Sequence, residues 1–190
     1  MDTVRKTLRV IVASLLIAAL SGIAALYIVT DPTTEIAAFG DFDPAPLERL
    51  SEKYELCDKD GAVMCTVGSD GRRLASFENV GKYTADAFLA IEDARFYEHG
   101  AVDPLRMAGA ALTNIASMEA KEGASTITQQ LVKNAYLSPE KTIMRKVREI
   151  RLARAVEQRY TKDEILEMYL NSVYFGNNIY GIENAAHGYF

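Results

Sequence analysis

Apolar side chains recur at the three- and four-residue spacing of helices over most of the chain after residue 84. Helix-start signals accompany this pattern: aspartate and proline at positions 103 and 104, and threonines at 126 and 161 that each precede Gln or Glu by three residues. The sequence therefore predicts a mainly α fold. We expect helices over about 84–97, 104–118, 139–160 and 161–169, one that begins near 126, and a short one after 178.

A different pattern precedes the helices. Short apolar runs between about residues 52 and 78 surround the turn signal Asp60-Gly61, which predicts a small β-hairpin. Cys57 and Cys65 flank this turn, and a loop centred on Gly61 would place them opposite each other. They could then form a disulfide outside the membrane, although free thiols fit almost as well. We assign them no catalytic role.

One segment near the start has the composition of a membrane anchor. Residues 8–30 are apolar or small apart from Arg9, and as a helix they would be about 34 Å long, enough to cross a bilayer. A cleaved signal peptide is the alternative, but its apolar core is normally shorter and ends in small residues. Basic residues precede the span and acidic ones follow it, which predicts an N-terminus inside and the bulk of the chain outside, periplasmic or extracellular.

These features divide the chain into four parts. We expect a cytoplasmic tail over residues 1–7, a transmembrane anchor over 8–30, a proline-containing acidic stalk over 31–51 and a folded domain over 52–190. The chain is expected to be a single-pass protein of the cytoplasmic membrane.

The net charge of −5 is unevenly distributed. Residues 133–159 carry 8 basic and 3 acidic side chains, a local balance of +5 in an acidic protein. Such a stretch points to an anionic partner, either a phosphorylated substrate or membrane lipid head groups, and a merely solvated helix face is the alternative. Nucleic acid is not expected outside a membrane. The two histidines have no metal-ligand spacing, so we assign no metal site.

Glu92 and Asp93 are the first candidates for chemistry. Helical spacing places Glu92 beside Phe88 and Phe96, and a carboxylate among apolar side chains tends to bind a proton more tightly, which suits general acid/base work. A surface glutamate paired with Arg95 is the alternative.

Two further groups could bind an anion. The stretch 125–130 follows a glycine-containing loop and opens a helix, where free amides and the helix dipole favour phosphate, and Lys133 shares a face with Gln129. Arg145, Lys146 and Glu149 also share a helix face, so two cations held by a carboxylate could grip a pyrophosphate. Ordinary capping and a surface salt-bridge ladder are the respective alternatives.

Together, four stretches resemble the peptidoglycan glycosyltransferases of glycosyltransferase family 51, the domain of class A penicillin-binding proteins and monofunctional transglycosylases. They are EDARFYEH at 92–99, GASTITQQLVKN at 123–134, RKVRE at 145–149 and KDEILEMYLN at 162–171, followed by a last motif over 173–183. The resemblance covers about residues 57–190. Ala101 and Ala124 stand where the family has glycine, and we expect the domain to be incomplete at its C-terminus.

The resemblance implies a lysozyme-like helical domain that polymerises the cell-wall precursor lipid II with inversion, releasing undecaprenyl pyrophosphate. It implies Glu92 as the general base and Glu149 as the second catalytic carboxylate. It implies substrate-binding roles for residues around the same cleft: Asp93, Ser125, Thr126, Gln129, Gln130, Lys133, Asn134, Arg145, Lys146 and Asn171. A divalent cation, Mg²⁺ or Mn²⁺, could assist at the pyrophosphate.

The expected partners are lipid II, the growing glycan chain, membrane lipids and cell-wall synthesis proteins. Two other functions stay open at this point. A lysozyme-like enzyme that cleaves the same glycan would share the fold and the glutamate, but it gives no reason for the basic residues to converge. An inactive membrane scaffold would share the fold without the chemistry.

Overall fold

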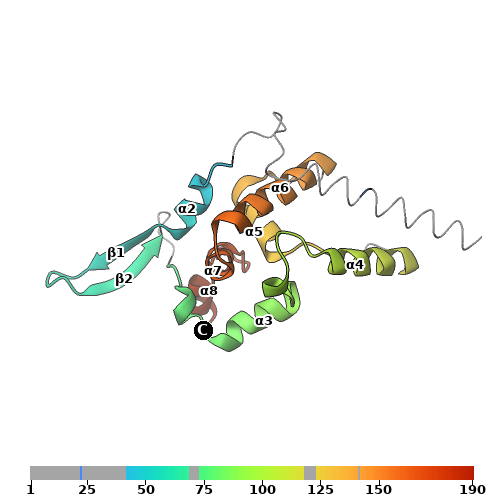
Figure 1. Ribbon diagram of the computed structural model, residues 1–190. Coiled ribbons are helices and arrows are strands. Elements are labelled where there is room, and N and C mark those ends of the chain that lie inside the picture. The colour runs from blue at the N-terminus through green and yellow to red at the C-terminus, as the bar shows by residue number, and fades with distance from the viewer. Residues whose placement is uncertain (1–21, 23–41, 69–72, 118–122, 141) are drawn as a thin grey trace, which may run out of the picture.

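The computed structural model describes residues 22, 42–68, 73–117, 123–140 and 142–190. Helices dominate this part of the chain, and a two-stranded sheet precedes most of them (Figure 1). The mainly α fold class is confirmed. The helices are α2 (Ala45–Ser51), α3 (Lys82–Glu92), α4 (Pro104–Ser117), α5 (Ile127–Tyr136), α6 (Ile143–Arg159), α7 (Lys162–Ser172) and α8 (Ile182–Tyr189), with short 3₁₀ turns η1 (Phe77–Asn79) and η2 (Phe96–Glu98).

Helix α7 lies at the centre of the core and packs against α5, α6, α2 and α8. Ile165, Leu166 and Leu170 on α7 are completely buried, and they meet equally buried side chains of α5 and α6. Helix α4 and the hairpin extend away from this centre in different directions (Figure 1). The helices that carry most of the candidate residues are therefore the ones held most firmly by apolar packing.

Local capping fixes where α5 and α7 begin. Thr126 and Thr161 each accept a hydrogen bond from the amide three residues on, while Gln129 and Glu164 accept one from the threonine amides. Both predicted capping boxes are confirmed. A capping box satisfies two backbone amides that a helix start would otherwise leave without partners.

Two predicted boundaries were wrong. The helix expected over 84–97 runs from Lys82 to Glu92, because Asp93 leaves the helical conformation with φ −160° and ψ 73°. The longest helix begins at Ile143 rather than at residue 139, because the side chain of Thr142 accepts a hydrogen bond from the amide of Arg145 and caps it there.

The predicted C-terminal boundary of the stalk, residue 51, was also wrong. Residues 45–51 form α2, which packs on α7, and Leu47 is completely buried in the core. A leucine at this depth belongs to the folded domain. The domain therefore begins before residue 52, and the rest of the expected stalk lies almost wholly outside the described residues.

The predicted hairpin is confirmed, with strands β1 (Lys53–Cys57) and β2 (Val63–Gly68) paired antiparallel. Its register differs from the one expected. Leu56 pairs with Cys65, and an irregularity after Leu56 pairs Cys57 with Val63. The two cysteines are consequently not opposite each other, and both are free thiols.

The predicted anchor, 8–30, lies outside the described residues except for residue 22. Within the described part of the chain, every helix is too short or too polar to cross a bilayer.

Candidate active site

Glu92 ends α3 and is held by a residue of α5. The side-chain amide of Gln130 donates a hydrogen bond to Oε2 of Glu92 at 2.8 Å. The other side of the Gln130 amide faces the hydroxyl of Tyr169, whose oxygen lies 3.5 Å from Oε1 of Gln130. Glu92 is half-buried, whereas Tyr169 is 1 % exposed. The predicted alternative, a Glu92–Arg95 surface pair, does not form, because Arg95 pairs with Asp103.

Asp93 is adjacent to Glu92 but has a different environment. It is completely buried, and Oδ2 accepts a hydrogen bond from the amide of Ile127 at 3.1 Å. Oδ1 lies 2.7 Å from Nε2 of His99. The expected contact between Asp93 and substrate is therefore not supported, because both carboxylate oxygens face inward and already have protein partners.

The start of α5 is likewise satisfied internally. Thr126 is completely buried, and its hydroxyl donates to the carbonyl of Ala101 at 2.8 Å while it accepts from the amide of Gln129. The amide of Ile127 is taken by Asp93. The prediction of free amides for a phosphate at this helix start was wrong for Thr126, Ile127 and Gln129, whose amides donate to side chains of the same protein.

The basic group on α6 assembles as the spacing predicted. Glu149 is 2 % exposed and accepts hydrogen bonds from Lys146 and, at 3.0 Å, from Arg145. The ammonium of Lys146 also donates to Oγ of Ser125 at 3.0 Å and lies 3.5 Å from Oε1 of Gln129. Lys146 therefore joins α6 to the start of α5, and its side chain remains 40 % exposed for a ligand.

Gln129 and Gln130 connect the two groups. Gln129 contacts Lys146, and the next residue, Gln130, contacts Glu92. Two consecutive positions near the start of α5 thus contact the candidate base and a candidate cation. Sequence spacing within α6 could not show this, because the contacts cross from helix to helix.

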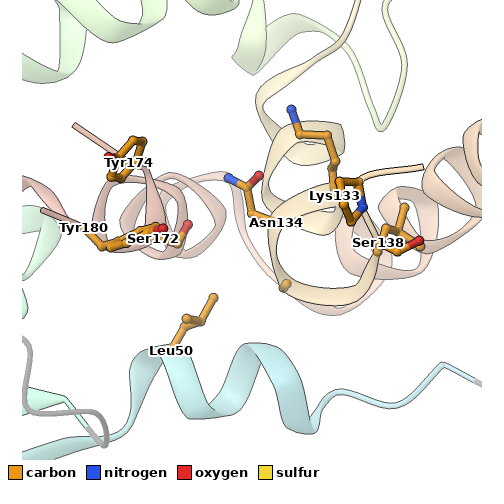
Figure 2. Close-up of a pocket in the computed structure, with 10 residues that line it drawn as sticks. Leu50, Lys133, Asn134, Ser138, Ser172, Tyr174 and Tyr180 are labelled. Atoms are coloured by element: carbon orange, nitrogen blue, oxygen red, sulfur yellow. The ribbon is translucent and has the colours of Figure 1, made fainter. Parts of the chain in front are cut away.

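Lys133 and Asn134 lie further along α5, beside a groove of about 480 Å³. Figure 2 shows them near Tyr174, Tyr180 and Leu50, which come from other parts of the chain. Both side chains are exposed, and Lys133 forms no ion pair with any residue that the structure describes. Lys133 lies one helical turn beyond Gln129, and within the described chain Glu149 pairs with Arg145 and Lys146 but not with Lys133.

Asn171 has a structural position. It is 3 % exposed, its amide donates to the carbonyl of Ala75 at 2.8 Å, and its Oδ1 accepts from the amide of Ala75 at 2.9 Å. This pair of bonds fastens the segment after the hairpin to α7. The expected role in substrate binding is not supported, since the side chain is enclosed and both its polar atoms have partners.

Asp93, His99 and Asp103 form a buried group whose ligand atoms lie within 4.8 Å of one another. Both ring nitrogens of His99 face acceptor oxygens, Nε2 toward Asp93 at 2.7 Å and Nδ1 toward the carbonyl of Gly100 at 2.6 Å. Both ring nitrogens therefore already have oxygen partners, and a metal ion bound to either nitrogen would displace one of them. These residues do not fit a divalent cation without losing their hydrogen bonds.

Arg106 and Tyr169 were not among the predicted site residues. The guanidinium of Arg106, on α4, donates to the backbone carbonyl of Glu92. Burial, and to a lesser degree the charge of Glu92, raise the pKa of Tyr169 to about 12. Nothing in the sequence signals the Arg106–Glu92 contact or the Tyr169–Gln130 contact, because each joins residues of two different helices.

Comparison with known proteins identifies the family of the helical part of the chain. Residues 60–190 match the transglycosylase family. The chain is 48 % identical to penicillin-binding protein 1A/1B of Bacillus subtilis over 133 residues, which is 70 % of this chain and 15 % of that protein. It is 45 % identical to penicillin-binding protein 1A of Escherichia coli, over 75 % of this chain and 17 % of that protein. The chain thus matches less than a fifth of the length of these two relatives.

Proposed function

Because this chain belongs to the transglycosylase family, we propose that it is a peptidoglycan glycosyltransferase, which extends the glycan chains of the cell wall. One observation carries the assignment of roles. Gln129 and Gln130, both near the start of α5, contact Lys146 and Glu92 respectively, so a cation and a carboxylate are each attached to the first turn of one helix. Sugar transfer from a diphosphate donor needs both, a base for the incoming hydroxyl and positive charge for the leaving group.

Glu92 acts as the general base in this proposal. Its Oε2 is held by Gln130, and its half-buried position leaves the carboxylate accessible to a sugar hydroxyl. The hydroxyl of the acceptor sugar gives its proton to Glu92 as its oxygen attacks the anomeric carbon of the donor. The donor carbon–oxygen bond breaks on the opposite side, so the configuration inverts and the diphosphate departs with the bonding electrons.

Positive charge on α6 stabilises that departing diphosphate. Lys146 and Arg145 are both held by Glu149, which fixes their geometry before the substrate arrives. In this proposal Glu149 acts by orienting the two cations, and Ser125 and Gln129 orient Lys146 further. A divalent cation would add positive charge at the same diphosphate; Lys146 and Arg145 would act beside it, because cationic side chains are not metal ligands.

The groove beside Lys133 and Asn134 extends the proposed binding surface along α5 (Figure 2). We propose that the substrate is lipid II, that undecaprenyl pyrophosphate is released, and that the groove holds part of the sugar–diphosphate portion. The chain would act at the outer face of the cytoplasmic membrane, in contact with membrane lipids, the growing glycan and cell-wall synthesis proteins. The predicted span at 8–30 would tether it there.

Incubation of the full chain with lipid II in detergent tests the proposal, with glycan polymer separated by length as the readout. We expect polymer from the wild type and a loss of at least about 10²-fold in rate for Glu92→Gln, because general base catalysis contributes about 10²- to 10⁴-fold. Lys146→Met should also reduce the rate. Arg159→Met is the matched control, since Arg159 forms an exposed ion pair with Glu48 on another part of the surface.

Finished glycan should be incubated with the same proteins. Release of fragments without polymer formation from lipid II would identify a lytic enzyme instead. Equal rates for the wild type and Glu92→Gln would contradict the base assignment, and absence of both reactions in a folded chain would favour a scaffold.

A further inference from the structure

A buried tyrosine lies behind the residue that holds the candidate base. Tyr169, on α7, is 1 % exposed, and its ring packs edge-on against Phe88 of α3 at 6.4 Å between centroids. Its hydroxyl reaches Gln130 of α5. The three helices α3, α5 and α7 therefore meet at Tyr169. On α3 its neighbour Phe88 lies one helical turn before Glu92.

The functional groups themselves decide which side chain donates and which accepts in the Glu92–Gln130 and Gln130–Tyr169 contacts. The carboxylate of Glu92 accepts hydrogen bonds only, so Gln130 must turn its NH₂ group toward it, as the 2.8 Å contact shows. The carbonyl oxygen of Gln130 then faces Tyr169, whose hydroxyl is the donor. If the amide were reversed, an oxygen of Gln130 would face an oxygen of Glu92 and the hydrogen bond would be lost.

We propose that Tyr169 is a positioning residue for the transfer reaction: its hydroxyl keeps the side-chain amide of Gln130 in the orientation that holds Glu92. This inference rests on the proposed function, because it assigns Tyr169 a role through the proposed base. The hydroxyl is buried, and a buried hydroxyl without a partner is costly, so the amide oxygen is held toward it. With Oε2 of Glu92 bound to Gln130, the second carboxylate oxygen is the one left to receive the proton of the acceptor sugar.

The raised pKa of Tyr169 agrees with this role. Burial is the larger cause and the charge of Glu92 the smaller one, so the phenol stays protonated and a donor across the physiological range. A phenolate would be an acceptor and would face the amide oxygen of Gln130 without a proton between them.

Tyr169→Phe tests the proposal because it removes one oxygen and keeps the ring in the core. We expect kcat for lipid II polymerisation to fall about fivefold with KM little changed, because the hydroxyl that orients the Gln130 amide is removed. Tyr136→Phe is the matched control: Tyr136 donates to the carbonyl of Asp43 at 2.8 Å, away from Glu92. An unchanged kcat in Tyr169→Phe, or an equal fall in the control, would overturn the inference.

A double-mutant cycle separates positioning from simple destabilisation. In a Gln130→Ala background, Tyr169→Phe should have no further effect on kcat, because its partner is already absent. A further fivefold fall there would show that Tyr169 does not act through Gln130. Both tests require a wild type that polymerises lipid II and a Glu92→Gln variant that does not. If this requirement is not met, the proposed function fails; if it is met, the tests address Tyr169 alone.

The amide orientation can also be observed without activity. The side-chain NH₂ protons of Gln130, followed by nuclear magnetic resonance, should shift in Tyr169→Phe and in Glu92→Gln but not in Tyr136→Phe. Identical Gln130 signals in wild type and Tyr169→Phe would overturn the inference even in a chain that shows no turnover.

Discussion

Asp93 binds the first amide of α5 across the fold: its Oδ2 accepts a hydrogen bond from the backbone nitrogen of Ile127 at 3.1 Å. The same carboxylate bonds His99 and is completely buried. The end of α3, where Glu92 is located, is thereby fixed to the start of α5, which carries Gln130 three residues later. A buried, fully bonded carboxylate of this kind is a support for the site rather than a contact for the substrate.

Removing this support should weaken the whole domain. Asp93→Ala leaves His99 and the Ile127 amide without their acceptor, and we expect the free energy of unfolding to fall by about 3 kcal/mol. Urea denaturation followed by circular dichroism measures the change. Asp60→Ala is the control, since its exposed pair with Lys59 should contribute less than about 1 kcal/mol. Equal urea midpoints for the two variants would contradict a supporting role for Asp93.

Asp103 should make stability depend on pH in the acid range. Burial alone would raise its pKa, but hydrogen bonds from the amide of Arg106 and from Arg95 outweigh this, and its pKa is lowered. The unfolded chain therefore binds the proton more readily than the folded one. The contribution of Asp103 to stability is complete above its unfolded pKa of about 3.9 and is lost as the pH falls below that value.

The measurement is the urea midpoint of unfolding between pH 7 and pH 2.5. We expect the wild-type midpoint to fall as the pH drops below about 4, and the fall to be smaller in Asp103→Asn, whose side chain does not titrate. Parallel curves for the two proteins would show that Asp103 contributes nothing to the acid sensitivity.

Gly181 should tolerate no side chain. Its φ is +82°, and a Cβ there would lie 2.8 Å from the backbone carbonyl oxygen of Asn171. Gly181→Ala should lower the free energy of unfolding by about 2 kcal/mol and reduce Tm accordingly. Gly100→Ala is a matched control, because a Cβ there meets no heavy atom within 4 Å. A Gly181→Ala variant with the Tm of Gly100→Ala would contradict the geometry.

The extended domain boundary is testable with a pair of leucines. Leu47→Ala opens a cavity in the core and should cost about 3 kcal/mol of unfolding free energy, whereas Leu56→Ala, at a position 53 % exposed on β1, should cost less than about 1 kcal/mol. Chemical denaturation distinguishes the two values. If Leu47→Ala unfolds at the wild-type urea concentration, α2 is not part of the cooperative core.

The sequence alone determined the features that depend on neighbours within one turn. The capping boxes at Thr126 and Thr161, the helix start at Pro104 and the grouping of Arg145, Lys146 and Glu149 all follow from spacings of three or four residues. The β-hairpin followed from its turn signal, and the ordered motifs indicated the family that the comparison later identified. Local signals of this kind do not depend on how the helices are packed.

Only the tertiary structure decided which polar residues face a ligand and which support the fold. Glu92 and Asp93 are consecutive, yet one is half-buried beside Gln130 and the other is sealed between His99 and Ile127. Asn171 bonds Ala75, which is 96 residues away. These contacts depend on how whole helices pack, because a buried polar group needs a partner and that partner comes from another helix or a distant segment. The spacing of residues along one helix does not indicate which residue the partner is.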